Sequence, residues 1–112
     1  MRVLEHKFDL LTKRQKEWYG PYLNYEKALL LFYEKNYWET HPIIDIAIEN
    51  YSGELDIILG NLFLLKGKVF DLQGDRSNAI EYYKKCIVLN NLSSAIKESK
   101  QYLKKPFTDY GL

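Results

Sequence analysis

The chain has few cysteines, prolines and glycines, and these shortages exclude several classes of protein. It contains one cysteine, three prolines and six glycines in 112 residues. A single cysteine excludes an intrachain disulfide and any metal site built from several thiolates. The prolines and glycines form no low-complexity tract, so no segment has the composition of a flexible linker. We therefore expect one small domain without covalent cross-links.

The sequence also lacks an excess of one charge and a long apolar run. Sixteen basic and fifteen acidic residues give a net charge of +1, which favours neither nucleic acid nor an anionic membrane. Residues 1–15 interrupt their apolar residues with charges, unlike a signal peptide. No stretch approaches the roughly 20 apolar residues of a membrane span. We expect a cytoplasmic protein with no nucleic-acid or membrane partner.

Aromatic residues are abundant, and the apolar residues recur with helical spacing. Ten Tyr, five Phe and two Trp are present, and such side chains suit both helix cores and binding surfaces. No alternating strand pattern occurs, so we expect an all-α chain. The expected helices span residues 3–18, 22–35, 42–51, 54–73, 76–90 and 92–104. The breaks at Gly20–Pro21 and before Pro42 follow from the usual places of glycine and proline at helix ends.

The most informative segment runs from Phe63 to Cys86. Its small and aromatic residues Phe63, Gly67, Phe70, Gly74, Ala79, Tyr83 and Cys86 follow one another at offsets of 4, 3, 4, 5, 4 and 3. Gly67 lies inside an apolar helical stretch, where glycine costs about 1 kcal/mol relative to alanine, which indicates close approach of a second helix. Gly74 ends that helix, and Asp75 caps the next. The pattern predicts an antiparallel helical hairpin, which a generic all-α protein could also contain.

This order and spacing resemble the tetratricopeptide repeat (TPR), a helix-turn-helix unit of about 34 residues that stacks into solenoids. The well-matched unit covers residues 60–93, and a degenerate unit covers residues 21–54, with Lys35 in place of the turn glycine and Pro42 inside its second helix. Residues 92–104 resemble a capping helix, and the tail over 105–112 would be pinned by Phe107. The resemblance implies a short right-handed solenoid of TPR-like hairpins, with about six helices including the capping helix.

The resemblance also implies where a partner would bind. In this family the first helix of each unit lines a concave groove. The matching positions here are Tyr22, Tyr25, Leu29, Phe32, Tyr33, Asn61, Leu64, Lys68 and Asp71. The implied function is a non-catalytic scaffold that binds a peptide or protein segment in an aromatic groove. Tyr25 and Leu64 stand where the clamp for acidic chaperone tails would need lysine or another polar residue, so we do not expect that ligand.

Two alternatives to a peptide groove follow from the short length of the array. TPR-like arrays need about three repeats to bury a continuous core, whereas this chain offers two at most. The same exposed helical face could therefore form a homodimer, a case of structural self-association. The aromatic side chains could equally be buried within the chain itself.

No arrangement of residues predicts catalysis. The histidines are His6 and His41 only. The sequence has no HExxH, no GxSxG, no glycine-rich phosphate loop and no Cys/His metal spacing. Cys86 falls on the apolar face of its helix and is expected to be buried. We therefore expect no enzyme activity, no cofactor and no metal.

Overall fold

The computed structural model describes residues 13–51, 56–91 and 93–108, and it is helical over most of them. The helices are α2 (Lys13–Tyr33), α3 (Tyr37–Glu49), α4 (Asp56–Leu72), α5 (Arg76–Ile87) and α6 (Ser94–Lys104). No strand occurs in the described ranges, so the expected all-α class is confirmed for that part of the chain. The first twelve residues, on which most of the expected helix 3–18 falls, and the tail after Thr108 lie outside the described residues.

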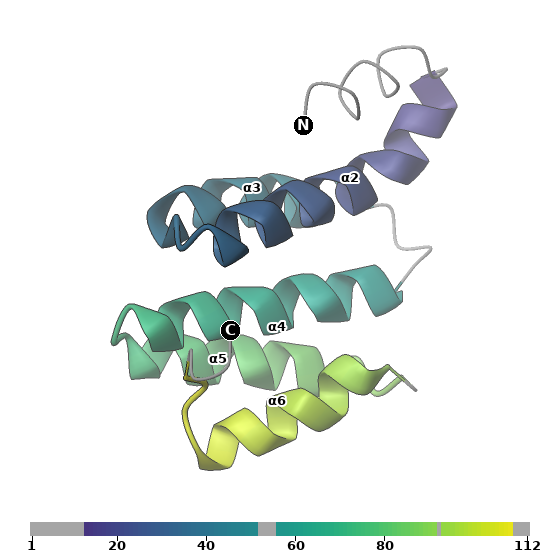
Figure 1. Ribbon diagram of the computed structural model, residues 1–112. Coiled ribbons are helices and arrows are strands. Elements are labelled where there is room, and N and C mark those ends of the chain that lie inside the picture. The colour runs from purple at the N-terminus through teal and green to yellow at the C-terminus, as the bar shows by residue number, and fades with distance from the viewer. Residues whose placement is uncertain (1–12, 52–55, 92, 109–112) are drawn as a thin grey trace.

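The helices pack in the order of the sequence. Helix α2 pairs with α3, α4 pairs with α5, and α6 lies beyond the second pair (Figure 1). Helix α4 also contacts both helices of the first pair, and α6 contacts both helices of the second. Helices α4 and α6 are therefore each placed against the pair that precedes them, and α2, α4 and α6 form successive neighbours along one side.

Two expected helix breaks are not found where the sequence places them. Helix α2 continues through Gly20–Pro21, so the expected end of one helix and start of another there is wrong. Proline removes a backbone donor and bends a helix without always ending it. Figure 1 shows α2 changing direction between its purple N-terminal part and the remainder. The proline-glycine pair thus falls within a bent helix, whose remainder packs on α3 and α4.

Helix α3 begins at Tyr37, whereas the sequence suggested a start at Pro42. The turn after α2 is so tight that the chain re-enters a helix at once. Thr40 reinforces this first turn, because its amide and its hydroxyl both donate to the Asn36 carbonyl, at 3.2 and 2.8 Å. Pro42 lies in the second turn, where the only intrahelical bond it forfeits is the one to the Trp38 carbonyl. The local bonds near Asn36 therefore outweigh the proline signal.

The two hairpin turns share one hydrogen-bond pattern, displaced by 39 residues. The Asn36 amide donates to the Leu31 carbonyl at 2.9 Å, as the Asp75 amide donates to the Phe70 carbonyl at 2.8 Å. Both turns are Schellman-type helix ends, which need a residue with positive φ. Gly74 supplies it in the second turn with φ 79°, and Lys35 supplies it in the first with φ 64°. The substitution of lysine for the expected glycine therefore leaves the turn intact.

Lys35→Gly is expected to stabilise the protein by about 1 kcal/mol, because a left-handed conformation is unfavourable for a residue with a Cβ atom. Chemical denaturation of the variant checks this value. Gly74→Ala is the matched control and should destabilise by a similar amount. A Cβ at Gly74 would meet nothing within 4 Å, so its effect isolates the backbone conformation. A destabilising Lys35→Gly would show that the lysine side chain contributes more than its backbone strain.

The core consists of two clusters that share α4. The first contains Ala28, Phe32, Ile44, Ala47, Ile58, Leu62, Leu65 and Val69, from α2, α3 and α4. The second contains Leu64, Ala79, Tyr83, Cys86, Ala95 and Ile96, from α4, α5 and α6. Helix α4 is covered on both sides, which explains why it is apolar around much of its circumference. The expected burial of Cys86 is confirmed.

Candidate binding face

The partner-binding residues predicted from the sequence lie on α2 and α4, and their solvent exposure differs widely. Tyr22 and Tyr33 are 46% and 64% exposed. The partly buried members are Tyr25, Leu29, Asn61 and Lys68. Phe32 and Leu64 belong to the two core clusters, at 3% and 5% exposure. The side chain of Asp71 is 1% exposed. The exposed and partly buried positions remain predicted contacts, whereas Leu64 mainly supports the fold and Phe32 lies in the core with Phe107 packed beside it.

Residues of α2, α4 and α6 converge on one side of the molecule, which we call the α2–α4–α6 face. It is formed by Tyr25 and Phe32 of α2, Lys68 and Asp71 of α4, and Glu98 and Tyr102 of α6, with the exposed Tyr22 beside Tyr25 and the exposed Tyr33 beside Phe32 at its edge. Lys68 Nζ lies 3.6 Å from Glu98 and 5.8 Å from the centre of the Tyr102 ring. Lys68 therefore links α4 to α6 by a charge pair and a cation–π contact.

Tyr25 belongs to this face by its electrostatics as well as its packing. Its ring packs against the first core cluster. Burial, together with neighbouring acidic groups that include Glu26 and Glu98, raises the pKa of Tyr25 to about 12. The hydroxyl therefore stays protonated at neutral pH and can act as a hydrogen-bond donor.

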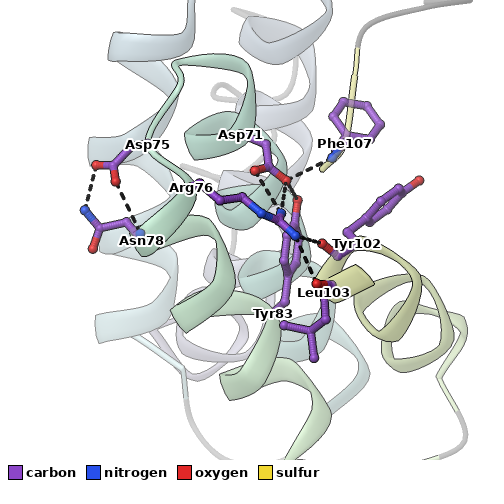
Figure 2. A network of polar contacts seen from close by, with 8 residues as sticks. All are labelled: Asp71, Asp75, Arg76, Asn78, Tyr83, Tyr102, Leu103 and Phe107. Atoms are coloured by element: carbon purple, nitrogen blue, oxygen red, sulfur yellow. Dashed lines mark hydrogen bonds and ion pairs between the residues drawn. The ribbon is translucent and has the colours of Figure 1, made fainter. Parts of the chain in front are cut away.

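The segment after α6 turns back over this face. Lys105 leaves the helix with an extended backbone, at φ −144° and ψ 127°. Two residues later, the Phe107 amide donates to Asp71 Oδ2 at 2.9 Å (Figure 2). The Phe107 ring lies 6.1 Å from Phe32 and 5.3 Å, edge-on, from Tyr102, and Lys68 Nζ is 5.0 Å from its centre. The chain's own C-terminal segment thus occupies the middle of the α2–α4–α6 face.

Asp71 of α4 accepts hydrogen bonds both from α5 and from the tail. Arg76 Nη1 donates to both carboxylate oxygens at 3.0 Å, and the Tyr83 hydroxyl donates to Oδ2 at 2.6 Å. The Phe107 amide adds a further donor. Bonds to an ionised carboxylate are roughly twice as strong as neutral ones. Burial and the Asp71 hydrogen bond raise the pKa of Tyr83, so its hydroxyl remains a donor.

Arg76 connects this carboxylate to the end of α6. Its Nη2 donates to the backbone carbonyls of Tyr102 and Leu103, at 2.6 and 3.1 Å (Figure 2). These carbonyls belong to the last turn of α6, where helix carbonyls lack intrahelical donors and attract a cation. Arg76 therefore fixes the point from which the tail departs, and Asp71 fixes the point at which it docks.

Sequence reasoning did not find the roles of Arg76, Glu98 and Tyr102. Tyr83 entered the motif only as an aromatic core residue, and its hydroxyl bond to Asp71 was not expected. The one local signal was the separation of Asp71 and Arg76 by five residues across a helix turn, which allows an ion pair. No spacing connects Phe107 to Asp71, 36 residues earlier in the chain.

A second polar cluster lies between α3, α4 and α5. Lys66 is 4% exposed, pairs with Asp45, and lies 5.6 and 5.3 Å from the centres of the Phe70 and Tyr82 rings. This lysine is held by one charge and two aromatic faces, which is a structural arrangement. The Lys66–Asp45 pair adds an ionic contact between α4 and α3.

His41 lies next to that cluster and pairs with an amide. Its Nε2 is 2.7 Å from Gln73 Oε1, and its ring centre is 4.3 Å from that of Phe70. Burial lowers the pKa of His41 from its ordinary value, which favours the neutral form of the ring. Among the described residues, the ring of His41 thus has an amide and an aromatic ring as its neighbours.

Two further features are absent from the described residues, and the chain has no match among known proteins. Among the described residues, no group of three or more His, Cys, Asp or Glu side chains is placed to hold a metal ion. Of the helices in the described ranges, none has the length and apolar character needed to cross a bilayer. The chain matches no model of a known protein family, no curated protein and no solved structure.

Proposed function

We propose that this chain is a cytoplasmic, non-catalytic interaction module that binds an extended protein segment on the α2–α4–α6 face. The observation that carries this proposal is the position of residues 105–108. A non-helical segment that leaves α6 through the extended Lys105 already lies on that face, with its backbone bonded to Asp71 and one aromatic side chain among aromatic and cationic groups. A surface that accepts one extended segment through these contacts has the chemistry to accept another.

The packing of the hairpins supports a TPR-like reading of this module. The two turns share a hydrogen-bond pattern, and α4 and α6 each pack on the pair of helices before them. Gly67 lies against the ring of Tyr83, as the close helix approach of such a unit requires. In this reading α2, α4 and α6 are the first helices of successive units in a short right-handed solenoid, and α6 is the cap. The face on which the tail lies is then the groove side of the array.

A second candidate function is self-association through the same face. The observation that favours it is the exposure of Tyr22 and Tyr33, two large aromatic side chains of α2. Exposed aromatic residues at the end of a short helical array are suited to a symmetric contact. Light scattering behind size exclusion, across low to high micromolar concentration, separates the candidates. A constant mass near 13.3 kDa favours binding of a foreign segment, and a doubled mass favours the dimer.

The interaction module is tested by selecting binders from a random peptide display library and measuring their affinity for variants. The combined change Tyr22→Ala and Tyr25→Ala is expected to weaken binding at least about tenfold, because aromatic anchors carry much of the energy of such interfaces. Trp38→Ala is the matched control, since Trp38 is an aromatic residue of α3 that is 80% exposed. Equal losses in both variants would mean that the α2–α4–α6 face is not the binding surface. Circular dichroism confirms that each variant is folded.

A further inference from the structure

We propose that the partner segment carries an aromatic residue that takes the place of Phe107, and that the chain's own tail competes for this place. This inference rests on the proposed function and specifies its ligand. In the described structure, residues 105–108 act as a tethered occupant of the binding face. A partner binds when its aromatic side chain and backbone replace those of Phe107.

The surroundings of Phe107 define what a replacement must offer. Its ring is approached by two aromatic rings, those of Phe32 and Tyr102, and by the ammonium group of Lys68. A cation over a ring face favours an aromatic side chain over an aliphatic one of the same size. The ligand class is therefore a segment with a Phe, Tyr or Trp at this position.

The backbone contact adds a second requirement. Asp71 Oδ2 accepts from the Phe107 amide at 2.9 Å, so the replacing residue must present a free backbone amide. Proline at that position is excluded, because it has no amide hydrogen. If the tail leaves without a replacement, Asp71 still keeps Arg76 and Tyr83 as donors. The Asp71 carboxylate therefore keeps hydrogen-bond donors when the tail leaves. Exchange of the tail for a partner segment does not require the hairpins to separate.

Within residues 105–108, the contacts with the α2–α4–α6 face are those of Phe107, and the tether that joins Phe107 to α6 is short. Thr108 and Pro106, on either side of Phe107, are exposed, as is Lys105. Phe107 alone therefore anchors the described part of the tail. A short tether gives an effective concentration in the millimolar range, so even weak docking keeps the face mostly occupied. A free segment with the same contacts then binds with an apparent affinity reduced by the closed fraction.

The test uses the full chain and a fluorescent peptide with the sequence of residues 104–112, KKPFTDYGL. Phe107→Ala opens the face, so this variant is expected to bind the peptide at least about tenfold more tightly than the original chain. Thr108→Ala is the control, because Thr108 is exposed, and it should bind like the original chain. A peptide in which alanine replaces its phenylalanine should bind neither protein. Fluorescence polarisation measures all of these affinities.

Equal affinity of the peptide for Phe107→Ala and for the original chain would overturn the proposal, as would no binding to folded Phe107→Ala. Display-selected peptides that still depend on Tyr22 and Tyr25 would then show that the interaction module stands and only the competition fails. A second measurement does not depend on the variant folding. Excess unlabelled peptide added to the ¹⁵N-labelled original chain should shift the Phe107 amide resonance as the tail is displaced. An unchanged Phe107 resonance at saturating peptide would refute the competition.

Discussion

Gly67→Ala is expected to destabilise the protein by about 3 kcal/mol, because the added methyl group has no space. A Cβ atom at position 67 would lie 2.4 Å from Cε1 and 2.6 Å from Cδ1 of Tyr83. The Tyr83 ring is fully buried in the second core cluster, and its hydroxyl is held by Asp71 at 2.6 Å. The ring cannot move aside without breaking that bond. Overpacking of this kind typically costs 1–3 kcal/mol or more, which outweighs the gain in helix propensity of about 1 kcal/mol.

Thermal and chemical unfolding of Gly67→Ala check this value, with Gly60→Ala as the control. Gly60 is in the same helix and is also buried. A Cβ at Gly60 would meet its nearest neighbour, the Leu89 side chain, at 3.5 Å, an ordinary contact. Gly60→Ala is therefore expected to be neutral or to stabilise by up to about 1 kcal/mol. Similar results for the two variants would mean that α4 and α5 are not packed as closely as the structure shows.

Asp71→Ala is expected to destabilise by about 3 to 5 kcal/mol, because it removes a buried carboxylate that accepts hydrogen bonds from Arg76, Tyr83 and Phe107. The Arg76 guanidinium, 31% exposed, would lose its partner, and the hydroxyl of Tyr83 would be left in the core. The free energy of unfolding of such a domain is usually about 5 to 15 kcal/mol, so this loss is a large share of the total stability. A fall in melting temperature of 10 °C or more, on the order of 4 °C for each kcal/mol, is the expected measurement.

Glu81→Ala is the matched control for the loss of a carboxylate. Glu81 lies 3.8 Å from Lys85 on the surface of α5, where both side chains are largely exposed. Such a surface pair contributes under about 1 kcal/mol. Asp71→Asn separates charge from shape, since an amide keeps the volume but offers Arg76 no negative partner. If Asp71→Ala were as mild as Glu81→Ala, the network around Phe107 would not hold the helices together.

The strongest sequence signals concerned neighbouring residues, and these are found in the structure. Gly74 adopts the left-handed conformation, and the Asp75 side chain accepts from the Asn78 amide as an N-cap. Lys35 has a positive φ at the same turn position as Gly74, although a lysine does not predict that conformation. Each of these features depends on a few consecutive backbone bonds. Local patterns therefore predicted the second hairpin well and underestimated the regularity of the first.

The prolines show where local reasoning was too strict. Pro21 and Pro42 both lie inside helices. A missing amide donor costs a few kcal/mol locally, whereas burial of Phe32, Ile44 and Ala47 in the first core cluster stabilises the continuous helices. This balance depends on contacts between α2, α3 and α4, so the sequence of one segment alone does not predict it.

The sequence by itself determined the all-α class, the turn between α4 and α5, and the close approach implied by Gly67. Only the tertiary structure decided how the candidate binding face is occupied. The Phe107 amide reaches Asp71 across 36 residues, and Arg76 reaches the Tyr102 carbonyl across 26. Such contacts depend on how α6 packs on α4 and α5, because a helical period specifies which residues share a face and not which distant backbone atom will meet them.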